Sequence, residues 1–113
     1  MNELPIIQKT YDFIKWYVPV LNRLPRNYRL GLGTRIINHL YDLLENLIRA
    51  RFSTSEKLEI LQNLNIKLDV IRHQTRLLSD FELISSDRYK YINIQINGIG
   101  SDLGGWTKNL SEP

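Results

Sequence analysis

The stretch LQNLNIKLDVIRHQTRLL, residues 61–78, decides the fold of this chain. Its core-type residues recur at alternating intervals of three and four positions: Leu61, Leu64, Leu68, Ile71, Thr75 and Leu78. This spacing is the heptad seam along which helices pack in bundles. The sequence therefore predicts a helix over about residues 55–80, with Thr54 or Ser55 as the residue that caps its amino terminus.

Three further segments carry a helical period. Residues 28–52 place Ile36, Leu40, Leu43 and Leu47 on one stripe, and residues 5–24 begin at a proline, which suits the first turn of a helix. A fourth helix is expected over residues 86–108, beginning at Ser85 or Ser86. Four helices joined by short turns predict an all-α fold, an antiparallel up-and-down four-helix bundle that forms one domain over residues 1–113.

The last segment also admits a strand. Residues 93–97 alternate between polar and apolar side chains as a strand does, but no partner strand is evident elsewhere in the sequence. The helical period runs over the whole segment, at Tyr89, Ile92, Ile96, Ile99, Leu103 and Trp106. We therefore expect a helix there.

Glycines interrupt this expected helix, and each costs about 0.5–1 kcal/mol relative to alanine. Gly100 and Gly104 lie four positions apart, on one helical face. Two interpretations stay open. A neighbouring helix, of this chain or of another subunit, approaches that face closely, or Gly104 and Gly105 mark fraying of the helix before Trp106.

Composition excludes several classes of protein. The 113 residues include no cysteine, so disulfides and thiolate metal sites are excluded. No apolar run approaches the ~20 residues needed to span a bilayer, and Met1 to Pro5 carry no basic segment of the kind that begins a signal peptide. We expect a cytoplasmic protein without membrane contact.

The arginines are placed unevenly. In an up-and-down bundle, the turn near residue 25 and the turn near residue 83 lie at the same end, which we call the basic pole. Seven of the nine arginines flank these turns, and they are the candidate nucleic-acid-binding residues: Arg23, Arg26, Arg29, Arg35, Arg72, Arg76 and Arg88. With Lys90 they outnumber Asp80, Glu82 and Asp87, giving the pole a charge of roughly +5.

Arginine suits phosphate recognition because its planar fork pairs with phosphate through two hydrogen bonds and stacks on rings. Tyr28, Tyr89 and Tyr91 lie next to these arginines in sequence. We therefore expect the basic pole to bind RNA or DNA. A second interpretation remains open, in which Arg26, Arg29 and Arg35 satisfy helix ends and carboxylates of other subunits in a bundle that binds only proteins.

No enzyme signature is present. Leu30 to Gly33 reads LGLG, but it lacks the third glycine of a dinucleotide fingerprint and the lysine of a phosphate loop, so a helix start that packs tightly is the better interpretation. His39 has only Asp42 nearby, and His73 has only Asp69, whereas a metal site needs three or four ligands. We expect no catalytic residue, no cofactor and no metal.

Two motifs resemble a known family: LPRNYRLGLGTRI at residues 24–36 and IGSDLGGW at residues 99–106. The chain is similar, from about Leu4 to Lys108, to the four-helix-bundle family that contains the accessory variability determinant (Avd) of diversity-generating retroelements and the ribosomal-RNA intervening-sequence proteins. Residue Gly31 adds a glycine before the usual Leu-Gly pair.

The resemblance implies small basic bundles that assemble as barrel-shaped homopentamers. For the Avd branch it implies a non-enzymatic partner of a reverse transcriptase that binds nucleic acid and supports mutagenic copying of a template repeat. For the intervening-sequence branch it implies an RNA-binding or protein-interaction bundle encoded within a ribosomal-RNA gene. The sequence does not separate the two branches.

Overall fold

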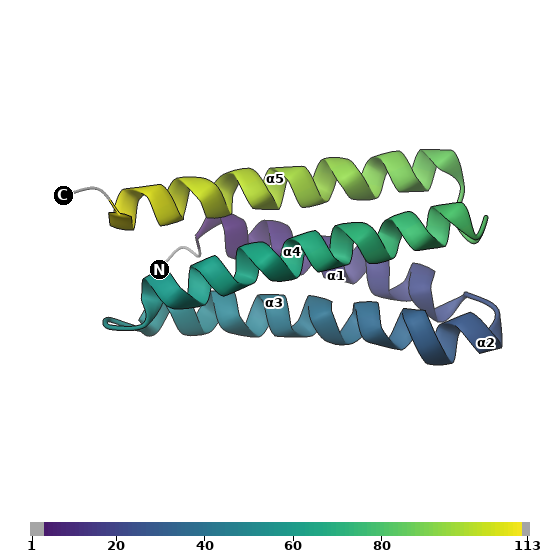
Figure 1. The fold of residues 1–113 in the computed structure, drawn as a ribbon, viewed down its shortest axis with the longest axis horizontal. Coiled ribbons are helices and arrows are strands. Elements are labelled where there is room, and N and C mark those ends of the chain that lie inside the picture. Colours follow the sequence, from purple (N-terminus) through teal and green to yellow (C-terminus); the bar gives the residue numbers. More distant parts are fainter. Residues whose placement is uncertain (1–3, 112–113) are drawn as a thin grey trace.

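The computed structural model describes residues 4–111 (Figure 1). The elements are α1 (Pro5–Asn22), α2 (Arg26–Tyr28), the π-helical turn η1 (Arg29–Gly33), α3 (Thr34–Phe52), α4 (Lys57–Asp80) and α5 (Ser86–Ser111). No strand occurs within residues 4–111, and residues 93–97 lie inside α5, so the helical interpretation of that segment is confirmed. The outermost residues of the expected domain, 1–3 and 112–113, lie outside the described part.

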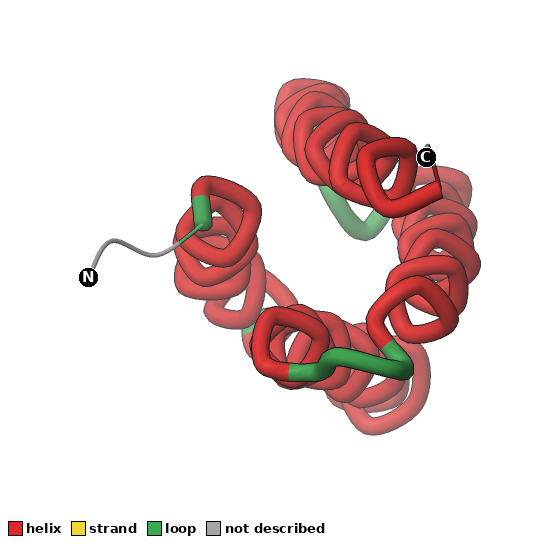
Figure 2. Tube along the Cα trace, turned by 90° about the vertical axis from the view of Figure 1, so that its left-hand side faces the viewer, coloured by secondary structure: helices red, strands yellow, loops and turns green. Residues whose placement is uncertain are grey.

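The four long helices run alternately up and down and form a ring (Figures 1 and 2). Contacts join α1 to α3, α3 to α4, α4 to α5 and α5 back to α1. The all-α prediction with four long helices is therefore confirmed. Assembly into a pentamer concerns further copies of the chain and stays a prediction.

The observed bounds lie close to the predicted ones, with one difference of kind. The predicted helix 28–52 begins instead at Arg26 and passes through η1 before α3. A π-helical turn widens the helix by one residue per turn, and such turns are frequent at functional sites. Within this turn Gly33 packs tightly, because a Cβ atom there would lie 3.4 Å from Leu24 Cδ1 and 3.4 Å from the Tyr28 carbonyl oxygen. The interpretation of the LGLG stretch as a tightly packed helix start holds only for the packing of Gly33, because the helix begins earlier, at Arg26, and a Cβ atom at Gly31 would meet nothing within 4 Å.

The predicted seam of α4 forms the core. All six of its positions are buried: Leu61, Leu64, Leu68, Ile71, Thr75 and Leu78. In α5 the four middle seam residues are buried, at Ile92, Ile96, Ile99 and Leu103, whereas Tyr89 and Trp106 at its ends are partly exposed. Because every middle position faces inward, the predicted register of both helices is confirmed.

Capping follows the predictions in one helix only. In α4 the prediction of Thr54 or Ser55 is wrong, because Glu56 occupies the cap position and makes no side-chain capping hydrogen bond. The Glu56 N–H donates to Ser53 Oγ at 3.1 Å, within the turn that precedes the helix. At the start of α5 the Arg88 N–H donates to Ser85 Oγ at 3.2 Å. Ser85 therefore caps that helix as expected.

The glycine face of α5 is open within the chain. A Cβ atom at Gly100 would lie 3.9 Å from Leu68 Cδ1, which is ordinary contact, and a Cβ at Gly104 would meet nothing within 4 Å. No helix of the same chain approaches this face closely. Fraying before Trp106 is also wrong, because α5 continues to Ser111. Close approach by another subunit stays a prediction.

Candidate nucleic-acid interface

Two turns form the basic pole, one between α1 and α2 and one between α4 and α5, and both lie at the same end of the bundle (Figure 1). An aromatic contact joins them, because the ring centroids of Tyr28 and Phe81 lie 5.7 Å apart. Such contacts add stability beyond the apolar area that they bury. The two turns therefore form one continuous surface.

The second turn is shaped by the end of α4. The Leu83 N–H donates to the Leu78 carbonyl oxygen at 2.9 Å, and the Glu82 N–H donates to the Ser79 carbonyl oxygen at 2.9 Å. This pattern is the Schellman motif, which requires a left-handed residue after the helix. Glu82 takes that conformation with φ 59°, which glycine adopts with less strain. The motif reverses the chain and directs the start of α5 back along α4.

The seven predicted arginines lie at or near this end. Those that are exposed are Arg23, Arg26, Arg35, Arg76 and Arg88, and Arg29 is partly buried. Arg35 lies nine residues after Arg26, and Arg72 lies eight residues before the last residue of α4, so both are about 12–13 Å from the turns along the helix axis. Arg72 is different because its side chain has partners within the chain. Its guanidinium is held by Asp69 at 3.1 Å and by Asn97 at 3.3 Å.

Most of these positive charges lack a partner. Among residues 4–111, no ion pair or side-chain hydrogen bond is made by the guanidinium groups of Arg23, Arg26, Arg29, Arg35 or Arg88. Arg76 only approaches Asp80, at 4.0 Å. Arg72 is neutralised by its ion pair with Asp69 and is left out of the charge count. The other six arginines and Lys90 then give seven positive charges against three carboxylates, a formal charge of +4 rather than the predicted +5. The predicted asymmetry of charge is present, and most of it is unneutralised within the chain.

Helix ends do not explain most of these arginines, although Arg23 is the carboxyl-terminal cap residue of α1. Cations stabilise carboxyl-terminal ends of helices and destabilise amino-terminal ends. The last turns of α1 and α4, which end at this pole, contain no basic residue. Arg26 and Arg88 lie instead in the first turns of α2 and α5. Arg26 begins the helix that continues through η1 into α3, and a cation is disfavoured at such a start. The interpretation that these arginines satisfy helix ends or carboxylates of another subunit stays open.

The aromatic residues take separate positions. Tyr28 contacts Phe81, and Tyr89 lies partly buried between α4 and α5. Tyr91 packs on Trp16 of α1, with ring centroids 4.5 Å apart. Sequence reasoning missed Phe81, whose side chain is 50% exposed in the turn between α4 and α5. The sequence does contain a feature that could have identified Phe81. It is an aromatic residue between two acidic residues, Asp80 and Glu82, at the point where a helix ends.

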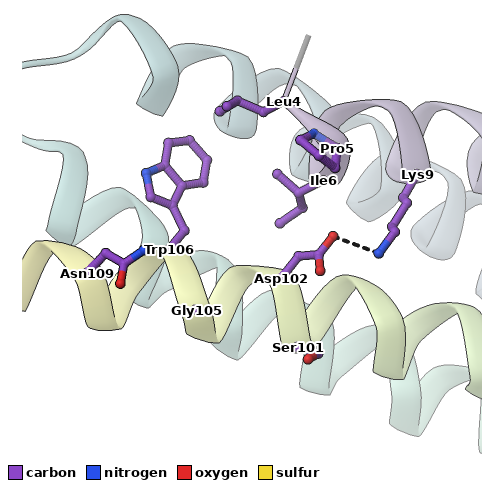
Figure 3. A pocket seen from close by; sticks show the side chains of 9 residues that line it. All are labelled: Leu4, Pro5, Ile6, Lys9, Ser101, Asp102, Gly105, Trp106 and Asn109. Atoms are coloured by element: carbon purple, nitrogen blue, oxygen red, sulfur yellow. Dashed lines mark ion pairs between the residues drawn. The ribbon is translucent and has the colours of Figure 1, made fainter.

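A second concave surface lies at the opposite end, where the start of α1 and the end of α5 diverge (Figure 3). Its volume is about 420 Å³, and the Trp106 ring projects into it. An ion pair of 2.8 Å between Lys9 and Asp102 crosses this groove and neutralises both charges. The groove therefore gives no attraction for an anion, in contrast with the basic pole.

Other chemistry is not supported by the described residues. Within residues 4–111, no group of three or more His, Cys, Asp or Glu side chains is placed to hold a metal ion. His39 hydrogen-bonds to Gln74 at 3.0 Å, and His73 Nδ1 lies 2.8 Å from the Asp69 carbonyl oxygen. None of the described helices combines the length and the apolar character that crossing a membrane requires.

Comparison with known proteins agrees with the motifs. No curated protein matches the sequence. The sequence model of a protein family described as bAvd-like matches residues 4–110, which include all four long helices up to the last residue but one of α5. This match, together with the observed helical fold, shows that the chain belongs to the bAvd-like family.

Proposed function

We propose that this protein is a non-enzymatic accessory scaffold of a retroelement reverse transcriptase, and that it binds RNA or DNA through the basic pole. In this role it supports mutagenic copying of a template repeat in the cytoplasm. Family membership supports the accessory role. The observation that carries nucleic-acid binding is the set of five arginines at the pole whose guanidinium groups have no partner among residues 4–111.

Partnerless arginines at one end favour a polyanion because each phosphate contact releases condensed counterions. The four exposed members come from different parts of the chain: Arg23 from the turn after α1, Arg26 from α2, Arg35 from α3 and Arg88 from α5. Contacts of this kind follow the phosphate backbone and read no base sequence. We therefore expect binding with little sequence preference and a steep dependence on salt.

Exposed apolar side chains support an assembly of several copies. Ile66, Val70 and Leu77 lie on one face of α4, and they are 65%, 39% and 43% exposed. Aligned exposed apolar residues typically mark protein contacts. We propose that the chain forms a homo-oligomer, a pentamer by the family resemblance, and that the reverse transcriptase docks on the assembled form.

The test of nucleic-acid binding compares two variants of equal charge change. Arg26→Gln with Arg88→Gln removes two cations from the basic pole, whereas Arg49→Gln with Lys57→Gln removes two from the opposite end. Binding is measured by fluorescence anisotropy over a range of salt. The first variant should bind more weakly, and its slope of log K against log salt should be shallower by about 1.4–1.8.

The control variant should keep both the affinity and the slope near wild type. Arg49 pairs with Glu56 at 3.0 Å, but both side chains are mostly exposed, so loss of that pair should cost little stability. Equal binding by the two folded variants would show that the basic pole is not the binding surface. In that case a bundle that binds only proteins becomes the better proposal.

The second candidate is the intervening-sequence branch, in which the same bundle is encoded within a ribosomal-RNA gene. Genomic context separates the two. An adjacent reverse-transcriptase gene with paired repeats supports the retroelement role, and placement inside a ribosomal-RNA gene supports the second.

A further inference from the structure

A groove between α4 and α5 opens beside the basic pole. Its volume is about 330 Å³, at the lower end of the range for ligand pockets. It is lined by Arg72, His73, Arg76, Tyr89 and Asn93. An aromatic ring, two guanidinium groups and two polar side chains thus converge in one concave site, next to a surface that already attracts phosphate.

The two arginines of the groove differ in their freedom. Arg72 is held by hydrogen bonds to Asp69 at 3.1 Å and Asn97 at 3.3 Å, so its guanidinium is oriented before any ligand arrives. Arg76 is mostly exposed, and only its Nε lies near a carboxylate, at 4.0 Å from Asp80. The two terminal nitrogens of Arg76 are therefore available to pair with a phosphate.

The polar side chains provide acceptors. Asn93 Nδ2 donates to the Tyr89 carbonyl oxygen at 3.0 Å, which leaves the Asn93 Oδ1 atom as an acceptor. The His73 Nδ1 atom lies 2.8 Å from the Asp69 carbonyl oxygen, and since a carbonyl oxygen only accepts, Nδ1 carries the proton. In the tautomer that carries its only proton on Nδ1, the Nε2 atom is also an acceptor. Acceptors beside an aromatic ring suit the amino edge of a nucleobase.

We propose that this groove binds one unpaired nucleotide of a single strand, with the base stacked on Tyr89 and the adjacent phosphate on Arg76. The proposal rests on the proposed nucleic-acid-binding function and adds a preference for single strands to it. A paired base is stacked between its neighbours and cannot enter a groove between two packed helices. An unpaired base presents its face and its edge freely, and aromatic side chains commonly use that face.

The experiment uses the full chain in its assembled form, with a short oligonucleotide and its duplex of equal length at one salt concentration. Tyr89→Ala should weaken single-strand binding by about 5- to 150-fold. Duplex binding should change by less than about twofold, because the exposed arginines remain. Tyr89→Phe should keep the single-strand affinity, and the matched control Tyr91→Ala, on the same helix but packed against α1, should leave both affinities unchanged.

A second measurement does not depend on the folding of a variant. A single strand that carries 4-thiouridine is cross-linked to wild-type protein by light, and the proposal expects the adduct on the peptide that contains Tyr89. If adducts form only on other peptides, the proposal that the groove binds a nucleotide is refuted.

The outcomes also separate this proposal from the one that it rests on. Suppose that Tyr89→Ala changes neither affinity or changes both equally, while the variant with Arg26→Gln and Arg88→Gln binds more weakly. The proposed nucleotide site in the groove is then refuted, and binding through the basic pole is still supported. If wild-type protein binds neither oligonucleotide, both proposals fail.

Discussion

One buried hydrogen bond allows a quantitative test of the core. The hydroxyl groups of Tyr17 in α1 and Thr75 in α4 lie 2.7 Å apart, and neither residue is exposed to solvent. The bond crosses the ring between helices that are not neighbours in it (Figure 2). Removing either hydroxyl leaves the other buried without its partner, which costs about 1–3 kcal/mol.

The two single variants should differ in a predictable way. Tyr17→Phe should cost stability at the lower end of that range, because the Thr75 hydroxyl can turn to the carbonyl oxygen one helical turn earlier. Thr75→Val should cost more, because the phenol has no such local acceptor. The double variant should be close to wild type, since it removes both polar groups together. Because the double variant costs almost nothing, the coupling between the two sites equals the sum of the two single costs, about 2–4 kcal/mol.

Urea unfolding followed by far-UV circular dichroism measures these differences. Each variant is compared at one protomer concentration, because assembly contributes to apparent stability. Tyr11→Phe serves as a control, since that tyrosine is 50% exposed. Costs below about 0.5 kcal/mol for both single variants, or a double variant equal to their sum, would refute the buried pair.

Four further predictions follow from particular residues. Burial raises the pKa of the Tyr17 phenol more than its hydrogen bond to Thr75 lowers it, so the folded state keeps the neutral form. This contribution to stability is complete below about pH 10, and above it wild type should lose about 1.4 kcal/mol per pH unit relative to Tyr17→Phe, as measured by unfolding at several pH values. Glu82→Gly should raise the free energy of unfolding by about 1 kcal/mol by relieving the left-handed backbone, whereas Gln62→Gly on the exposed side of α4 should lower it by a similar amount, and thermal melts distinguish them. Gly104→Leu should leave the folded subunit intact, because nothing of the same chain lies within 4 Å of the new Cβ, but it should break the assembly seen by light scattering if another subunit approaches that face. Arg88→Gln should raise stability at low salt by about 0.3–1 kcal/mol, since it removes a cation from the first turn of α5, and a loss of stability would assign Arg88 a structural role.

Local sequence patterns predicted the helices well, because the spacing of the buried apolar residues is a property of each segment by itself. Leu68 and Ile96 are buried where the seam placed them. The bounds failed where several local interactions compete. Glu56, rather than Thr54 or Ser55, precedes the first residue of α4, and periodicity does not decide at which residue of that turn the helix begins.

Features that depend on packing between distant segments were not predictable. Arg72 is bound by Asn97, which is 25 residues away and on another helix, so this contact of its guanidinium follows only from the fold. The same holds for the contact between Tyr28 and Phe81. The charge asymmetry itself was predictable, because it needs only the alternation of helix direction and not the side-chain geometry.

The basic pole is the part of the chain that departs most from what stability alone favours. It places Arg88 in the first turn of a helix, Glu82 in a left-handed conformation and a π-helical turn at Arg29–Gly33. Each of these features costs free energy, and exposed like charges repel one another. The opposite end also places a cation, Lys57, in the first turn of a helix, but two other cations there are paired within the chain, Lys9 with Asp102 and Arg49 with Glu56. Departures from local rules concentrate at functional sites. Their coincidence at one end of this bundle therefore supports a ligand-binding role for that end, independently of the family to which the chain belongs.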